Sequence, residues 1–103
     1  MENLELRLSA QRALLGAITP NVRAVSGEIE SKRLRLKFLV DGEIDDDTRD
    51  NLSAATGEIA ADIPQSAWEG GWSLEDQYER LDAPSPLTGS LLSEVFYVRF
   101  EAT

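Results

Sequence analysis

Carboxylates are the most abundant side chains in this sequence that could act as an acid, a base or a metal ligand. The 103 residues include nineteen Asp and Glu but no Cys and no His, so the chain offers no thiolate nucleophile, no cysteine metal site and no imidazole base. Glu58 and Asp62 lie four residues apart, so on a helix they would share one face and could act as an acid/base pair or hold a metal ion. Because solvent-exposed helix faces often carry such pairs, we predict no catalytic residue, no metal site, no cofactor and no enzymatic activity.

The densest run of carboxylates extends from Asp41 to Asp50. It does not match a calcium loop, because its second residue is glycine and Leu52 occupies the position of the bidentate glutamate. Local folding accounts for part of this run: Asp41-Gly42 ends a strand in a turn, Asp45 caps a helix, and Asp46-Asp47 favours the positive end of that helix. Asp46 and Asp47 exceed what a cap requires, so they are candidates for a role at the surface.

Two segments have the apolar spacing of amphipathic helices. In residues 3–16 we expect Leu4, Leu8 and Leu15 to form a stripe that faces the core. Four further apolar residues widen that stripe: Leu6, Ala10, Ala13 and Leu14. The second helix follows the cap at residue 45 and ends near residue 63, before Pro64, with a buried stripe of Leu52, Ala55, Thr56, Ile59 and Ile63. Gly57 costs this helix about 1 kcal/mol relative to alanine, so we expect a close packing contact there.

Three segments are predicted to be β-strands. Residues 22–30 change their apolar parity just before Gly27, which indicates a bulge or a bend. Residues 32–40 show period-2 alternation, so one face is buried and the other meets water. The apolar row is Leu34, Leu36, Phe38 and Val40, and the basic row, Arg33, Arg35 and Lys37, can pair with Glu28 and Glu30 across the sheet. Residues 94–101 are apolar on both faces, so we expect this strand to be central or covered on both sides.

Residues 73–82 fit two structures. Ser73 to Asp76 resembles a helical capping box, and Leu74, Tyr78 and Leu81 have helical spacing. The last strand needs a neighbour in a sheet, so we favour a strand here. The predicted order is therefore α-β-β-α-β-β in one domain of the α+β class, in which two helices cover one face of a four-stranded, mostly antiparallel sheet.

The net charge of −9 is unevenly distributed. Residues 1–40 carry seven Lys and Arg against four Asp and Glu, whereas residues 41–82 carry thirteen Asp and Glu against two Arg. Such segregation produces a directed field that can steer a basic partner. The same negative charge disfavours direct binding to nucleic acid.

Two tryptophans lie in the predicted loop of residues 65–72, beside a Gly-Gly hinge. Tryptophan is enriched among the residues that dominate binding energy at protein interfaces. Trp68 and Trp72 could serve in this way, or they could close the open edge of the small core.

Several segments resemble a group of small bacterial proteins. They are Ser9–Gly16, Ile18–Val25, Asp41-Gly42-Glu43 and Ala60–Pro64. The group resembles the immunity proteins encoded beside polymorphic toxins, including those of contact-dependent growth inhibition. The resemblance implies a cytoplasmic protein, without a catalytic site, that binds the C-terminal catalytic domain of a cognate toxin and masks its active or substrate-binding surface. Many such toxins are nucleases.

We therefore expect a toxin domain as the partner, with neither nucleic acid nor a membrane bound directly; no apolar stretch is long enough to cross a bilayer. The expected contacts are the carboxylates and aromatic residues of the acidic region: Asp45, Asp46, Asp47, Trp68, Glu69, Trp72, Glu75, Asp76, Tyr78 and Glu79. Two alternatives remain: an acidic regulator or nucleic-acid mimic that binds a host protein, and a small enzyme or metal-binding domain built on Glu58 and Asp62.

Overall fold

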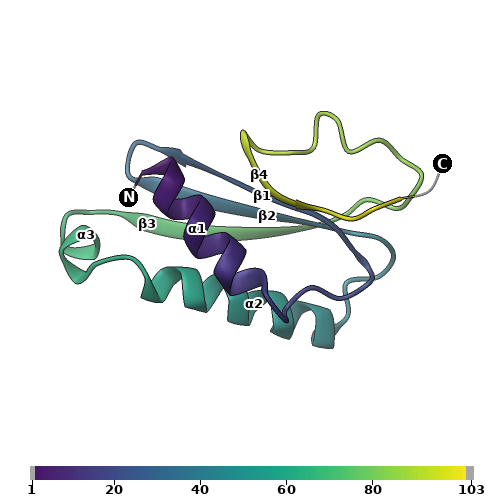
Figure 1. Ribbon diagram of the computed structural model, residues 1–103, viewed down its shortest axis with the longest axis horizontal. Coiled ribbons are helices and arrows are strands. Elements are labelled where there is room, and N and C mark those ends of the chain that lie inside the picture. Colours follow the sequence, from purple (N-terminus) through teal and green to yellow (C-terminus); the bar gives the residue numbers. More distant parts are fainter. Residues whose placement is uncertain (1, 102–103) are drawn as a thin grey trace.

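Two long helices pack on one face of a four-stranded sheet in the computed structural model, which describes residues 2–101 (Figure 1). The elements are α1 (Asn3–Leu14), β1 (Val22–Glu30), β2 (Arg33–Val40), α2 (Asp46–Ala61), α3 (Gln65–Glu69), β3 (Ser73–Arg80) and β4 (Glu94–Val98). The predicted α+β class and the order α-β-β-α-β-β are confirmed, and so is the strand at residues 73–82. The short helix α3 adds one element within the predicted loop of residues 65–72.

The strands are arranged in the order β3-β2-β1-β4. β1 is antiparallel to both β2 and β4, whereas β3 runs parallel to β2. The parallel pair follows from α2, because a helix between two strands carries the chain back to the starting edge of the sheet. β4 lies at an edge of the sheet, so the central position is wrong; its first four residues are half-buried and Val98 is exposed, so the strand is only partly covered. Its neighbour β1 supplies one row of hydrogen bonds, and its Phe96 and Tyr97 pack against the core.

The core lies between the sheet and the two long helices. The alternation of β2 is confirmed, because Leu34, Leu36, Phe38 and Val40 are all buried on the helical side. Leu6 of α1 and Leu52 and Ile59 of α2 pack in the same cluster. Each such buried aliphatic side chain stabilises the fold by roughly 1.5–3 kcal/mol.

The predicted core face of α1 is wrong. Leu4, Leu8 and Leu15 are 64%, 58% and 79% exposed, whereas the residues predicted to widen their stripe are buried. The buried set, which includes Ser9, is Leu6, Ser9, Ala10, Ala13 and Leu14. Its small members let α1 approach α2 and the sheet closely. The three leucines on the opposite side of the helix therefore point away from the core.

Gly57 has open space where a close contact was predicted, whereas Gly27 is tightly surrounded. Apart from the adjacent backbone of α2, no atom of the described chain lies within 4 Å of the position that a Cβ at Gly57 would occupy, so the close contact predicted there is wrong. A Cβ at Gly27 would lie 2.9 Å from Cε2 of Phe96 and 2.9 Å from the carbonyl oxygen of Arg35. The predicted irregularity of this strand is confirmed, since the register of β1 shifts between Val25 and Ser26 against β4.

The end of the described chain is held by a buried arginine. Arg23 is only 2% exposed, and its guanidinium donates two hydrogen bonds to Glu101, of 2.7 and 2.8 Å, and a third to the carbonyl of Leu81. Arg99 also donates to Glu101, and it pairs with Asp41 at 3.0 Å. This network joins the ends of β1, β2, β3 and β4. None of the helices in residues 2–101 is long and apolar enough to cross a membrane.

Candidate functional site

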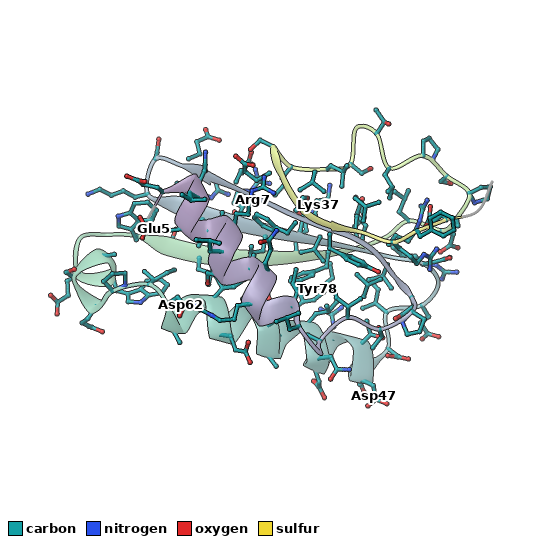
Figure 2. The ribbon with its side chains drawn as sticks, viewed as in Figure 1. Glu5, Arg7, Lys37, Asp47, Asp62 and Tyr78 are labelled. Atoms are coloured by element: carbon teal, nitrogen blue, oxygen red, sulfur yellow. The ribbon has the colours of Figure 1, made fainter. Side chains whose placement is uncertain are left out.

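The expected contact residues at the start of α2 lie apart from those of α3. Asp45 caps α2 as predicted, because its carboxylate accepts a 2.8 Å hydrogen bond from the backbone amide of Thr48, which lowers the pKa of Asp45. Asp46 and Asp47 occupy the first turn and are exposed. Figure 2 shows Asp47 at one end of α2, while α3 follows the other end. A 16-residue helix spans about 24 Å, so these groups do not form one contiguous patch.

Glu75 and Glu79 lie on the face of the sheet that the helices leave open. On this face they are neighbours of the basic row of β2. Arg33 pairs with Glu75 at 2.8 Å, and Lys37 lies 3.7 Å from Glu79. Arg35 contacts both Glu75 and Glu28, so the predicted pairing of β1 with β2 is confirmed at Glu28. The charges on this face therefore largely balance one another within the protein.

Asp76 and Tyr78 are in register with buried β2 residues and lie on the helical side of β3. The ring of Tyr78 stacks on Phe38 with centroids 5.2 Å apart, and Arg49 of α2 lies 4.7 Å from the centroid of Tyr78. The Tyr78 hydroxyl donates to Asp76 and lies 3.0 Å from the Ser53 hydroxyl. Burial, more than these contacts, raises the pKa of Tyr78. Tyr78 thus serves first to hold α2 on the sheet.

Both tryptophans are half-buried, but only Trp68 is among the residues packed against the core cluster. Trp68 in α3 is half-buried and packs against the core, which matches the interpretation that it closes the open edge. Trp72 is also half-buried, just before β3, and Glu69 is exposed beside them.

Glu58 and Asp62 do not act as a pair. Asp62 accepts hydrogen bonds from Ser9, at 2.6 Å, and from Arg12. Both contacts lower the pKa of Asp62, that from Ser9 the more, so its carboxylate fastens α1 to α2. Within residues 2–101 no group of three or more acidic side chains is placed to hold a metal ion.

Most basic residues of the chain are already neutralised. Eight of the ten Lys and Arg are in ion pairs with carboxylates, and Arg49 lies over Tyr78. Eleven carboxylates of the described chain are outside these ion pairs, and seven of them lie on the two long helices and their N-caps: Glu2, Glu5, Asp45, Asp46, Asp47, Asp50 and Glu58. The negative field of the protein therefore arises mainly from its helical layer.

The exposed leucines of α1 are the surface feature that sequence reasoning missed. The available signal was that α1 carries two apolar stripes on opposite sides, Leu4-Leu8-Leu15 and Leu6-Ala10-Ala13. Only one of them can face a core. An exposed row of large apolar side chains marks a contact surface.

These features define a protein that offers surfaces for contact rather than a constellation of catalytic groups. The family model described as MafI2 immunity protein matches residues 3–101, and no curated protein matches the chain. The chain thus belongs to the MafI2 immunity protein family. It is an immunity protein of a toxin–immunity system and not an enzyme, and membership implies that it binds and neutralises a cognate MafB toxin. The predicted resemblance to toxin immunity proteins is confirmed.

Proposed function

We propose that the protein neutralises its toxin by covering the active or substrate-binding surface of a nuclease domain. The observation that carries this proposal is the surplus of carboxylates outside ion pairs on α1 and α2. A nuclease holds the phosphate backbone with Lys and Arg, and an inhibitor that presents carboxylates can occupy the same surface. Complementary charge also speeds encounter and favours the cognate partner over others.

Within this proposal, Asp46 and Asp47 are the first electrostatic contacts. They are exposed, and within the described residues neither is in an ion pair. Asp45 adds charge beside them, Glu69 adds charge beyond the other end of α2, and Asp76 adds charge near the middle of α2, beside Tyr78. Glu75 and Glu79 contribute by exchanging their internal basic partners for those of the toxin. Trp68, Trp72 and Tyr78 supply apolar contact area that slows release.

We also propose that the encounter takes place in the cytoplasm of the protected cell. A nuclease reaches its substrate there, after delivery by a route such as contact-dependent growth inhibition. The immunity protein would then act on toxin that has already entered.

Two charge reversals of equal size test the proposal. Asp47→Lys and Glu30→Lys change the net charge by the same amount, and both residues are exposed. We expect Asp47→Lys to slow association with the toxin domain by about tenfold at low salt, with a weaker salt dependence. Glu30→Lys, on the far side of the sheet, should change the rate much less. The readouts are stopped-flow association and nucleic-acid cleavage by the purified toxin domain.

The outcome that would overturn the proposal is a toxin domain that cleaves no nucleic acid, or one that still cleaves when saturated with the wild-type protein. If the two reversals had equal effects, only the proposed role of Asp47 would be contradicted, and the proposed inhibition of a nuclease would stand. Circular dichroism of each variant checks that α2 still forms.

A further inference from the structure

α1 and the residue that caps its C-terminal end, Leu15, present a row of leucines directly to solvent. Leu4, Leu8 and Leu15 recur at helical spacing and are each more than half exposed. A single exposed leucine is ordinary, but three in one row are not explained by the core, which the opposite face of α1 completes.

A shallow groove runs beside this row, between α1 and α2. Three hollows of ≈ 280, ≈ 270 and ≈ 190 Å³ follow one another, and neighbouring hollows share lining residues. Ser9 and Asp62 line the first two, and Ala13 and Glu58 line the second and third. Small side chains form much of the surface, since Ala54, Ala55 and Ala61 also line it. The groove is therefore open to side chains from outside.

Leucines and carboxylates border this groove together. Leu8 lines its first hollow and Leu15 its third, and Glu5 and Glu58 lie beside them. In Figure 2 Glu5 and Asp62 mark the end of the groove near the N-terminus, and Asp47 lies at the far end of α2. Neither Glu5 nor Glu58 is in an ion pair within the described chain, whereas Asp62 is held by Arg12.

We propose that the leucine row and the groove together dock a basic amphipathic helix of the toxin domain, which deepens the proposed function and rests on it. Rows of side chains at helical spacing pack best against rows of the same spacing on another helix. The apolar face of the incoming helix covers Leu4, Leu8 and Leu15. Its flanking Lys and Arg meet Glu5 and Glu58.

The same observations disfavour other occupants and other faces. A second copy of this chain would bring the free carboxylates of both helical layers together, and like charges repel. Small molecules typically bind in concave pockets that enclose most of their surface, whereas these hollows form a shallow, open groove with carboxylates along it. The open face of the sheet is internally paired, and its Ser26 is taken up by a hydrogen bond from Leu92.

The experiment compares two double variants in binding to the purified toxin domain by calorimetry. Leu8→Ser with Leu15→Ser changes the proposed surface. Val98→Ser with Phe100→Ser is the matched control, because both residues are exposed apolar side chains at the β4 end of the sheet. We expect the leucine variant to weaken binding by at least ~30-fold, as loss of a hot spot does, and the control to bind within about threefold of the wild type. Thermal unfolding should show that both variants are folded.

The other outcomes would contradict the docking surface, the proposed function or both. Wild-type affinity of the folded leucine variant would overturn the docking surface, and so would a larger loss in the control. A wild-type protein that forms a leucine-dependent dimer in sedimentation, and binds the toxin equally well without those leucines, would assign the row to a second copy. Leucine-dependent binding without inhibition of nucleic-acid cleavage would leave the surface standing and overturn the proposed function. Absence of binding by the wild type would overturn both.

Discussion

Gly27 lies where β1 passes close to Phe96 and to the backbone of β2, and no side chain fits there. The carbonyl oxygen of Arg35 and the Phe96 ring are both 2.9 Å from the position of a Cβ. Gly57, inside α2, has open space at the same position. Glycine is thus required by packing at one site and only weakens a helix at the other.

Alanine at these two positions should have opposite effects on stability. We expect Gly27→Ala to lower the free energy of unfolding by ~1–3 kcal/mol, because Phe96 or the β2 backbone must move. Gly57→Ala should raise it by about 0.5–1 kcal/mol, since alanine favours helix and meets nothing. Urea denaturation of both variants measures this difference. A stabilising Gly27→Ala would contradict the close approach of β1 and β4.

α1 carries two apolar stripes, and the elements that pack against it determine which stripe is buried. Leu6 is fully buried, and Leu8, two residues later, is 58% exposed. The helix is fixed on both flanks: Arg7 pairs with Glu94 of β4 at 2.6 Å, and Arg12 pairs with Asp62 beside α2. These pairs orient α1 so that Leu6 faces the core and the leucine row stays exposed.

Alanine substitutions at Leu6 and Leu8 distinguish the buried face of α1 from its exposed face. Leu6→Ala should cost ~2–5 kcal/mol, because it removes a buried side chain and leaves a cavity. Leu8→Ala should change stability by only about 0.5 kcal/mol, as is usual at the surface. Chemical denaturation gives both values. Equal losses at the two sites would mean that the leucine row is part of the core, and the docking surface proposed above would lose its basis.

At the scale of the whole molecule, an ion-pair network closes the fold. Glu101 receives two hydrogen bonds from buried Arg23, and Arg99 links Glu101 to Asp41 at the start of the acidic run. The hydrogen bonds from Arg23, followed by that from Arg99, lower the pKa of Glu101 from 4.5 to about 2. Asp41 therefore has a structural role in addition to the predicted turn.

This shift makes the contribution of Glu101 depend on pH. Because its pKa is lower in the folded protein, the stabilisation is complete above about pH 4.5 and is lost as the pH falls towards 2. Glu101→Gln should destabilise the protein at neutral pH, and its difference from the wild type should shrink progressively below pH 4.5. Glu30→Gln, at an exposed carboxylate outside the ion pairs, is the control and should have little effect. A difference that stays constant down to about pH 2 would contradict the pairing with Arg23.

The sequence by itself determined α1, α2, β1, β2 and β4 as elements, and the two sides of β2. Alternation from Arg33 to Phe38 leaves only one way to bury the apolar row, and Asp45 followed by two further aspartates specifies a helix start. These are local preferences of the backbone and of hydrophobic burial, so they can be read from neighbouring residues. The class of the fold follows from the order of such elements.

The tertiary structure alone decided which stripe of α1 is buried, where β4 lies and how the charges pair. Both stripes of α1 are apolar, and only the fit of Ala10 and Ala13 against α2 and the sheet selects one of them. Likewise, nineteen carboxylates in a sequence do not say which are neutralised by a distant arginine. Long-range packing assigns Glu75, Glu79 and Glu101 to internal pairs and leaves Asp47 and Glu58 outside them, because an ion pair depends on distance in space and not on separation along the chain.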